Sequence, residues 1–379
     1  MDKVYSDSLK LHKKFHGKLE VKSKVPIKNK RDLSLAYTPG VAEVCRTIAK
    51  DKNLTREYTI KKNTVAVVSD GSAILGLGNL GAEAAIPVME GKAALFKEFA
   101  GVDAFPICLD TQDTEEIIKA VKYLAPVFGG INLEDISAPR CFEVEDRLKK
   151  ELSIPVMHDD QHGTATVVLA GIINALKLKK LDKTSAKVVI SGAGAAGTAV
   201  AKMLIHYGFK NVLVCDSKGL IYKGRPDLNK PKMELAELTN PQAGADTGLA
   251  AVLRKADVFI GVSGPNIITR REVKSMNTKP VVFALANPTP EIMPDEAKAG
   301  GAYIVATGRS DFPNQLNNVL AFPGIFRGAL DNKVSQITDR MLVKAAENLA
   351  KYVKNLHPKN ILPNSLDKGV VKVVAKAIR

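Results

Sequence analysis

One glycine-rich segment constrains the fold of this chain more than any other feature. Residues 192–197 read Gly-Ala-Gly-Ala-Ala-Gly, directly after the apolar run Lys187–Ser191 and just before a stretch with helical apolar spacing. In such a βα turn the first glycine makes the tight turn, the second lets the backbone approach a pyrophosphate, and the third allows close packing of helix on strand. The N-terminus of the helix then faces the phosphates. The sequence therefore predicts a dinucleotide-binding unit.

A carboxylate at the end of the next apolar run supports this prediction. Asp216 ends the run that begins at Asn211, 24 residues after Gly192. A carboxylate at about this spacing hydrogen-bonds the adenosine ribose and repels a 2′-phosphate, which favours NAD. Lys218 and Arg225 lie nearby and soften that preference, so NADP stays open as a cofactor. The predicted cofactor-binding residues of this unit are Gly192, Gly194, Ala195, Ala196, Gly197 and Asp216.

The rest of the chain repeats the same strand–helix rhythm. From about residue 65 to residue 308, short apolar runs alternate with helix-length segments, which is typical of βαβ units and parallel sheets. A long helix is expected to follow Gly163, and the tail after Asp331 reads as helices. Strands are expected at residues 65–69, 104–109, 128–133, 154–158, 187–191, 211–216, 256–261, 280–286 and 302–306.

The length of 379 residues is that of two domains. We predict an α/β protein with two domains, each built on a mostly parallel sheet with flanking helices, the second domain being Rossmann-like. The N-terminal domain, which would hold substrate and metal, spans residues 1–160. The Rossmann dinucleotide-binding domain spans residues 161–330. Residues 331–379 are expected to form a C-terminal helical tail that packs back on the N-terminal domain.

Composition argues against several other classes of protein. The 55 Lys and Arg residues against 40 Asp and Glu residues give a net charge of +15, but aromatic residues make up only 5% and Trp is absent. Since no aromatic platform accompanies the basic residues, we expect no nucleic-acid partner, and the charge instead attracts anionic substrate and cofactor. No apolar run is long enough to cross a membrane, and residues 1–31 have no secretory signal. Four separated cysteines favour a reducing, cytoplasmic location.

Acidic residues follow strand after strand in the first half. The expected strands end at Asp70, at Asp110, at the pair Glu134–Asp135 and at the pair Asp159–Asp160. Because the carboxyl ends of parallel strands share one edge of the sheet, these acids would repel one another unless protonated or neutralised by a cation. Oxygen ligands suit Mg²⁺ or Mn²⁺ better than Zn²⁺. A divalent metal site is therefore predicted, with helix capping as the alternative for a single acid.

Two further motifs have other interpretations. Residues 76–81, Gly-Leu-Gly-Asn-Leu-Gly, also fit G-x-G-x-x-G, but six residues separate them from the preceding strand. We interpret them as a flexible active-site loop rather than as a second nucleotide site. His158 and His162 have the spacing of a zinc-protease motif, yet they lie at a strand end rather than inside a helix. A polar role near the site is therefore favoured over zinc binding.

Four side chains can move protons or bind a substrate, although none would be assigned on its own. Lys92 begins an apolar helical stretch, where desolvation lowers the pKa of a lysine and makes it a base. Tyr37 precedes a Pro-Gly turn. Asn287 follows an expected strand, Asn318 lies ahead of Phe322, and amide donors of this kind bind carboxylates. The ordinary alternatives are a surface lysine, a core tyrosine and turn-capping asparagines.

Taken in order, these segments resemble the malic enzyme family, in particular its small bacterial-type members. The resemblance extends over residues 35–330, and the combination of segments is specific although each one alone is not. The matching segments are residues 37–40, 69–72, 76–81, 89–92, 132–135, 158–164, 192–197, 286–289 and 315–324.

The resemblance implies oxidative decarboxylation of L-malate to pyruvate and CO₂, with reduction of NAD or NADP. It implies that Glu134, Asp135 and Asp160 bind the divalent metal, Mg²⁺ or Mn²⁺. Lys92 would be the general base with Asp159 beside it, and Tyr37 the general acid. Asn287 would contact substrate or nicotinamide, and Asn318 would contact substrate.

The resemblance also implies a homo-oligomer, expected to be a dimer, in which Tyr37 can serve a neighbouring subunit's site. One position departs from the larger eukaryotic-type members, where an arginine grips the substrate carboxylate; Ala73 stands there in this chain. Two other functions stay open. The chain could be a different NAD-dependent dehydrogenase of a small acid, or a non-catalytic nucleotide-binding protein, although the latter has no need of the acidic pairs.

Overall fold

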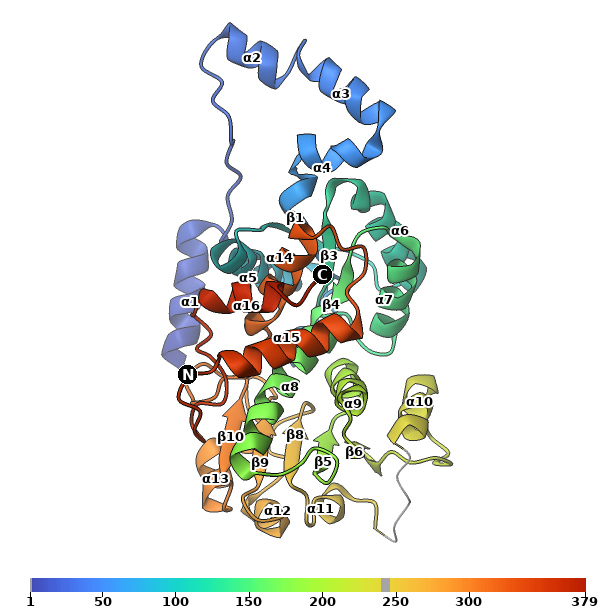
Figure 1. Ribbon diagram of the computed structural model, residues 1–379, viewed down its shortest axis with the longest axis vertical. Helices are drawn as coiled ribbons and strands as arrows, with labels where there is room; N and C mark the ends of the chain where they lie inside the picture. Colours follow the sequence, from blue (N-terminus) through green and yellow to red (C-terminus); the bar gives the residue numbers. More distant parts are fainter. Residues whose placement is uncertain (1, 240–245) are drawn as a thin grey trace.

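The first of two sheets carries the acidic segments. The structure, a computed structural model, describes residues 2–239 and 246–379. The first sheet has four parallel strands in the order β2-β1-β3-β4 (Figure 1). The strands are β1 (Thr64–Ser69), β2 (Asp103–Cys108), β3 (Gly130–Leu133) and β4 (Val156–His158). Every residue of β1, β3 and β4 is buried, as expected for a parallel sheet covered on both faces.

The second sheet carries the glycine-rich turn. Its order is β10-β9-β8-β5-β6-β7, and all neighbours are parallel except β6 and β7. The strands are β5 (Lys187–Ser191), β6 (Asn211–Asp216), β7 (Gly219–Leu220), β8 (Val258–Gly261), β9 (Val281–Ala284) and β10 (Ile304–Thr307). The order reverses on either side of β5, so the carboxyl end of β5 is a switch point where ligands bind in doubly wound sheets. The predicted α/β class with mostly parallel sheets is confirmed.

Helices cover both sheets. Those of the first sheet are α5 (Ala82–Ala100), α6 (Thr114–Leu124) and α7 (Arg140–Glu151). Those of the second are α9 (Ala195–Tyr207), α10 (Lys230–Thr239), α11 (Leu249–Val252), α12 (Arg270–Ser275) and α13 (Pro294–Ala299). α8 (Asp159–Lys179) leaves β4 and leads to β5, so it joins the two sheets and packs against α9 and α15 (Figure 1). No helix in the described ranges is long and apolar enough to cross a membrane.

The start of α8 differs from the prediction. We expected this helix to follow Gly163, but it begins at Asp159. Gly163 lies inside the helix because its missing side chain leaves room for the Asp159 carboxylate; a Cβ there would lie 1.8 Å from Asp159 Oδ1. Asp159 and Asp160 therefore occupy the first helical turn, where the helix dipole favours negative charge.

The C-terminal helices return to the first sheet. They are α14 (Phe322–Asp331), α15 (Asp339–Tyr352) and α16 (Gly369–Ala375), and α14 packs against α5 and α16. The ring of Phe96 meets the rings of Phe322 and Phe326 edge-on, with centroids 4.7 and 5.5 Å apart. This aromatic contact ties the C-terminal segment to the helix that carries Lys92. The domain boundaries at residues 160 and 330 stay a prediction.

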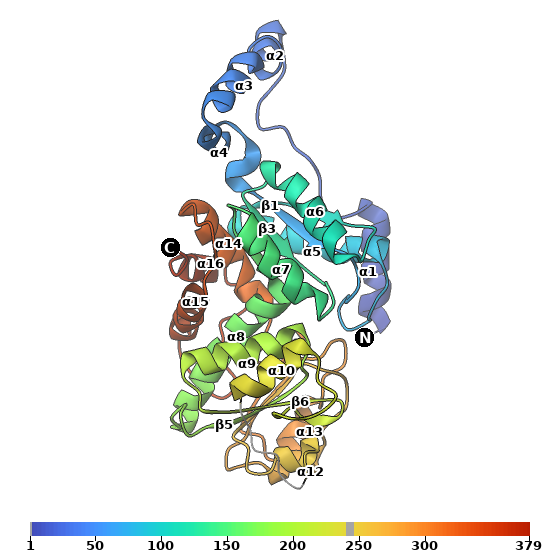
Figure 2. The same cartoon turned by 90° about the vertical axis from the view of Figure 1, so that its right-hand side faces the viewer.

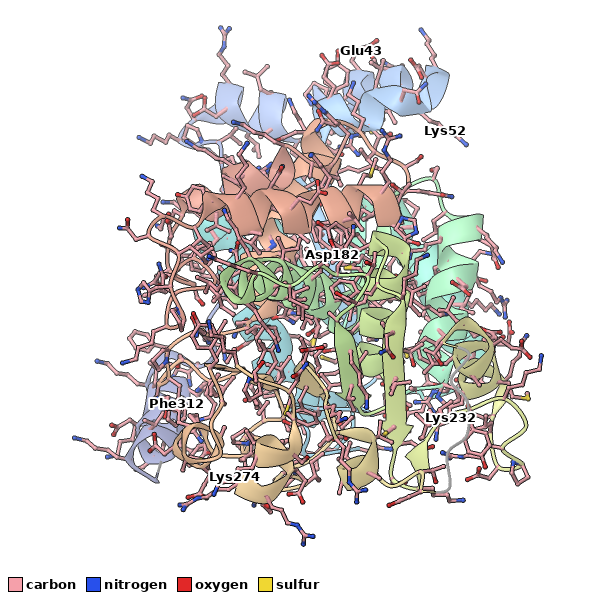
Figure 3. All side chains as sticks on the ribbon, turned by 60° about the horizontal axis from the view of Figure 1, so that its bottom comes forward. Glu43, Lys52, Asp182, Lys232, Lys274 and Phe312 are labelled. Carbon is pink, nitrogen blue, oxygen red and sulfur yellow. The ribbon has the colours of Figure 1, made fainter. Side chains whose placement is uncertain are left out.

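A projecting arm, residues 30–58, extends from the body of the molecule (Figure 2). It holds α2 (Lys30–Ala36), α3 (Val41–Lys50) and α4 (Thr55–Tyr58), and none of their residues is buried. Glu43 and Lys52 mark the arm in Figure 3, at the opposite end from Lys274. The chain enters the arm from α1 (Asp2–Phe15), which lies along the side of the body. The sequence analysis did not foresee this arm.

Candidate active site

Three carboxylates meet at the edge of the first sheet. Glu134 and Asp135 follow β3, and Asp160 lies in the first turn of α8, which follows the neighbouring strand β4. One oxygen from each of the three lies within 4.8 Å of the others. The backbone N–H of Asp135 donates to Asp160 Oδ2 at 2.9 Å, which fixes the two segments relative to each other. The structure thus brings together the three acids predicted to hold a metal.

The electrostatics of this cluster suit a cation. Burial, together with the neighbouring Asp160, raises the pKa of Glu134 well above its usual value and that of Asp135 to about 8, against the lowering effect of Lys92. Asp135 Oδ2 is buried and accepts no hydrogen bond from the residues that the structure describes. Asp135 also has a positive φ of 52°, an uncommon conformation for a residue with a side chain. Crowded, partly unpartnered oxygens of this kind fit Mg²⁺ or Mn²⁺.

Lys92 points into the same cluster. It lies on α5, its side chain is 7% exposed, and its Nζ is 2.6 Å from Glu134 Oε1. It also donates a hydrogen bond to Asp159 Oδ2 and lies 4.4 Å from the centroid of the Phe322 ring. Burial lowers the pKa of Lys92, but Asp159 and Glu134 raise it by more, so it ends above its usual value. In this arrangement the lysine is an ammonium held between two carboxylates.

Asp159, in the first turn of α8, and Asn318, in η4, both approach Gly163 of α8. Asp159 is fully buried, and burial raises its pKa to about 6 against the lowering effect of Lys92. Asn318 begins η4 (Asn318–Leu320), and its Cβ is 3.4 Å from the point where a Cβ on Gly163 would lie. The bare face of Gly163 therefore lets both side chains approach the helix. Of the predicted residues, Lys92, Asp159, Asn318 and the three acids predicted to bind a metal form one site.

The glycine-rich turn lines a separate cavity of about 750 Å³ at the switch point of the second sheet. Gly192 has a φ of 117°, and a Cβ on Gly197 would lie 1.8 Å from its carbonyl oxygen. Both positions therefore require glycine. Gly192, Gly194 and Asp216 line the cavity, and Ala195 and Ala196 begin α9 beside it. Ala138, Pro139 and Phe142 line it from the first sheet's side, so the cavity lies between the two sheets.

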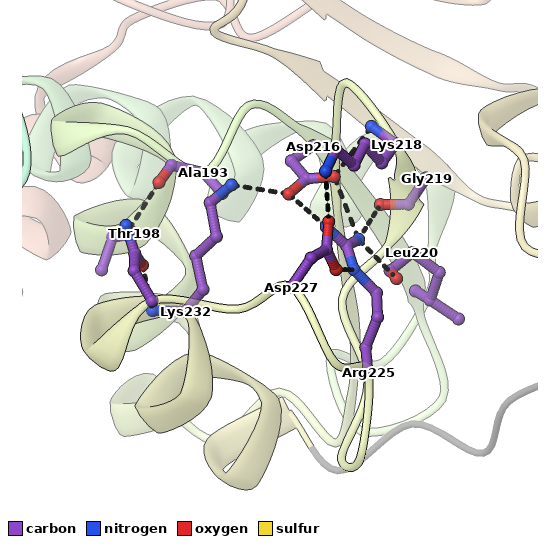
Figure 4. A network of polar contacts seen from close by, with 10 residues as sticks. Ala193, Thr198, Asp216, Lys218, Gly219, Leu220, Arg225, Asp227 and Lys232 are labelled. Atoms are coloured by element: carbon purple, nitrogen blue, oxygen red, sulfur yellow. Dashed lines mark hydrogen bonds and ion pairs between the residues drawn. The ribbon is translucent and has the colours of Figure 1, made fainter.

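Asp216 is already paired in this pocket (Figure 4). Arg225 donates to both of its oxygens, at 3.0 and 2.7 Å, and Lys232 Nζ lies 2.6 Å from Oδ2. Burial raises the pKa of Asp216, but the hydrogen bonds from Arg225 and Lys232 outweigh it and bring the pKa down to about 2. Because Lys218 and Lys232 also line the cavity, the ribose end of the pocket is not a site of net negative charge.

Asn287 lies at the carboxyl end of β9, where the sequence placed it. A Cβ on Gly76 would lie 2.5 Å from the carbonyl oxygen of Asn287, and a Cβ on Gly308 would lie 2.8 Å from its Nδ2. The loop of residues 76–81 is not a second nucleotide turn, since β1 ends at Ser69 and no strand leads into it. It contacts the loop after β9 and so connects the two sheets at the cleft.

Tyr37 lies away from these residues. It is the C-cap of α2 on the projecting arm, and it is 64% exposed. In Figures 1 and 2 this helix is far from α5 and α8. Within one chain the structure therefore does not bring Tyr37 to Lys92.

Sequence reasoning missed several residues that hold the site. Glu145 of α7 is 2% exposed and accepts hydrogen bonds from His158 N at 3.0 Å, Gln161 Nε2 at 3.1 Å and His162 Nε2 at 2.9 Å. It thereby fixes the start of α8 against α7. Asn132 Nδ2 similarly donates to Glu134 Oε2 at 3.0 Å. No spacing in the sequence marks the contacts of Glu145, because its partners come from a separate element.

Comparison with known proteins places these features in one group. Residues 161–378 match the malic enzyme NAD-binding domain, and residues 16–116 and 111–149 match the malic enzyme N-terminal domain. The chain is 57% identical over 375 residues to the bifunctional malic/malolactic enzyme of Bacillus subtilis, with 98% of this chain and 91% of that protein covered. It is 56% identical over 364 residues to the NAD-dependent malic enzyme of Geobacillus stearothermophilus, with 96% and 76% covered.

Two further matches extend the comparison. An NADP-dependent malic enzyme of Rhizobium meliloti is 51% identical over 349 residues, which cover 91% of this chain and 45% of that protein. The crystal structure of the NAD-dependent malic enzyme of Thermotoga maritima matches with a TM-score of 0.94 at 51% identity, over 98% of both chains.

Proposed function

The chain belongs to the malic enzyme family, and from this premise we propose that it converts L-malate to pyruvate and CO₂ by metal-dependent oxidative decarboxylation. It is an NAD(P)-dependent oxidoreductase. The observation that carries the proposal is the contact of buried Lys92 with Asp159 and Glu134, directly beside the three clustered acids. A binding protein that only senses nucleotide would bury this charge at considerable cost and to no purpose.

The side chains divide the reaction between them. Lys92 takes the proton of the C2 hydroxyl as hydride leaves C2 for the nicotinamide cofactor. To accept this proton, Lys92 must be a neutral amine. Asp159, which accepts a hydrogen bond from Lys92, is the neighbouring carboxylate that would take the lysine's proton beforehand. Loss of CO₂ then leaves an enolate, and Tyr37 protonates its C3 to give pyruvate.

Glu134, Asp135 and Asp160 are the residues that would hold Mg²⁺ or Mn²⁺. Their oxygens lie close enough together to share one ion, and the orphaned Asp135 Oδ2 supplies an open ligand. A bound divalent ion would polarise the C2 oxygen and stabilise negative charge on it after loss of CO₂. Asn287 and Asn318 would orient the substrate through their amide groups. With Ala73 unable to grip a carboxylate, these amides gain importance.

The cofactor is NAD or NADP. The paired state of Asp216 and the lysines around it support the use of NADP as well as NAD, because the carboxylate that would repel a 2′-phosphate is already neutralised. The acidic residue at this position therefore does not restrict the chain to NAD.

Tyr37 would act in a second copy of the chain. The projecting arm leaves Leu35 67% and Tyr37 64% exposed, although burying apolar side chains stabilises a protein. A homodimer in which each arm lies on its neighbour would cover this surface and complete both sites. The domain division at residues 160 and 330 and the cytoplasmic location belong to the same proposal.

Malate-dependent reduction of NAD and of NADP, followed at 340 nm with and without Mg²⁺ or Mn²⁺, tests the function. The expected result is pyruvate formation that stops when a chelator is added and returns when the ion is restored. Oxidation of malate that persists without metal would contradict the assignment of the three acids. Reduction with another small acid in preference to malate would favour a different dehydrogenase.

A further inference from the structure

A buried glutamate outside the site described so far holds two of its loops. Glu291 follows β9 and is 0% exposed. Its Oε1 accepts the backbone N–H of Ser263 at 2.9 Å, and its Oε2 accepts the backbone N–H of Ala286 at 3.0 Å. Ser263 follows β8 and Ala286 follows β9, so one carboxylate spans the carboxyl ends of two neighbouring strands. Burying a carboxylate is costly, and an apolar residue would fill the same space more cheaply.

The fold leaves a space for this side chain. Gly261 ends β8, and a Cβ on it would lie 2.3 Å from Glu291 Cδ and 2.5 Å from Cγ. The carboxylate therefore lies directly over the end of β8, where only glycine fits. Burial raises the pKa of Glu291, and the two backbone N–H groups counter this. These contacts are specific in position as well as in chemistry.

Both loops reach functional surfaces. Ser263 lines the cofactor cavity, and its Oγ lies 3.2 Å from that of Ser191 at the end of β5. The neighbouring Val262 packs on the glycine turn, since a Cβ on Gly192 would lie 2.5 Å from its carbonyl oxygen. Ala286 directly precedes Asn287, whose exposed side chain donates a long hydrogen bond, of 3.4 Å, to Leu285 O. The position of Asn287 therefore depends on how the loop that carries it is held.

We propose that Glu291 is a positioning residue, whose carboxylate sets the loop carrying Asn287 against the Ser263 wall of the cofactor cavity, so that nicotinamide and substrate meet. This inference rests on the proposed function in assigning Asn287 to substrate or nicotinamide. Glu291 itself touches neither. It acts through two backbone N–H groups, and a shift of about 1 Å at a reacting centre is enough to lower turnover by orders of magnitude.

Glu291→Gln tests the proposal, because it keeps the shape but can accept only one of the two N–H groups while its own amide opposes the other. Affinities for NAD⁺ and for ADP-ribose, which lacks nicotinamide, are measured by calorimetry. We expect the ratio of the two affinities to fall by about tenfold, with ADP-ribose binding retained. We also expect kcat to fall, and the isotope effect with 2-deuterated malate to rise because hydride transfer becomes slower. Glu291→Asp should restore part of the loss.

Glu296→Gln is the matched control, since Glu296 lies on the nearby α13 with its side chain 47% exposed. If E291Q lowers thermal stability but leaves the affinity ratio, kcat and the isotope effect at wild-type values, Glu291 is only structural and the proposal is wrong. If E291Q does not fold, the same measurements on Gly261→Ala decide, because this change moves the carboxylate without removing it. The binding ratio needs no turnover, so it separates this inference from a failure of malate oxidation.

Discussion

Several carboxylates and one ammonium group share a largely buried space, and the pKa values of Lys92, Glu134, Asp135 and Asp159 depend on the neighbouring charges. Lys92 lies at ion-pair distance from Glu134 and Asp159. Among the described residues, no lysine or arginine lies at that distance from Asp135 or Asp160. The cluster is therefore underneutralised. At the scale of the residue, both the proposed chemistry and the proposed metal requirement rest on this one imbalance.

Lys92→Ala removes the proposed base. We expect kcat with malate to fall by a factor of about 10²–10⁴, while NAD binding stays near wild type because the cofactor cavity is untouched. The measurement is steady-state turnover together with calorimetric NAD titration. Lys97→Ala, on the same helix but with a 63% exposed side chain, is the control and should keep full activity. Turnover close to wild type in Lys92→Ala would remove the base assignment.

Asp135 makes the stability of the metal-free protein depend on pH. Its pKa is about 8 when folded and about 4 when unfolded, so the folded state holds its proton more tightly. This contribution is full below about pH 4 and is lost as the pH rises toward 8, by at most about 1.4 kcal/mol per pH unit. In EDTA, the stability of wild type relative to Asp135→Asn should therefore fall between pH 5 and pH 8.

Urea unfolding of both proteins at several pH values measures this difference. With Mg²⁺ present at pH 8, wild type should instead be more stable than Asp135→Asn. The reason is that the ion binds the ionised carboxylates, and only the folded state presents them together. A stability difference that does not change with pH would show that Asp135 is not strained by its neighbours.

At the scale of the element, α8 decides the geometry of the site. Gly163→Ala would normally stabilise a helix by about 0.5–1 kcal/mol. Here the added Cβ would overlap Asp159 Oδ1, so we expect lower kcat and a changed pH profile. Gly171→Ala, on the same helix, is the control. Its added Cβ would lie 3.3 Å from the Phe283 ring, so it crowds the core but should leave kcat intact. Equal effects of the two substitutions on kcat would contradict the role of Gly163.

The approximate positions of most strands and their parallel type could be predicted from the sequence, because buried parallel strands leave short apolar runs between helical segments. β5 and β6 fall at the predicted residues, and the strand ends place the acids at one edge. The start of α8 could not be predicted. Gly163 reads as a helix boundary, and only the folded position of Asp159 explains a glycine within the helix. The short β7 was missed because two residues carry no pattern.

The candidate site shows the same division. Lys92 and the acids could be named because their motifs are local, and Arg225 because it lies near Asp216 in the sequence, whereas Lys232 as a partner of Asp216 could not. Lys232 reaches it from α10, 16 residues further along the chain, and Arg225 from the loop between. Glu145 and Glu291 are likewise invisible in the sequence, since hydrogen bonds to backbone groups leave no residue pattern.

At the scale of the whole molecule, the projecting arm separates Tyr37 from Lys92 within one chain. Two inactive variants, Tyr37→Phe and Lys92→Ala, should therefore complement each other when mixed and allowed to exchange subunits. Half of the dimers are then mixed, and each has one intact site, so activity should recover to about a quarter of wild type. Separate solutions of each variant are the controls. No recovery after proven exchange would mean that Tyr37 does not act across the dimer.

The joining helix α8 also has a bearing on how such a protein can be divided or recombined. Its first turn carries Asp160, which belongs to the proposed cation site, and it ends at Lys179, shortly before the strand that leads into the glycine turn. A chimera that exchanges the cofactor half with a relative must therefore be spliced after this helix, within residues 180–186. A crossover before this helix would take Asp160 from the relative and Glu134 and Asp135 from this chain, so the proposed ligands of one ion would come from two proteins. The helix therefore belongs with the first half in any such exchange.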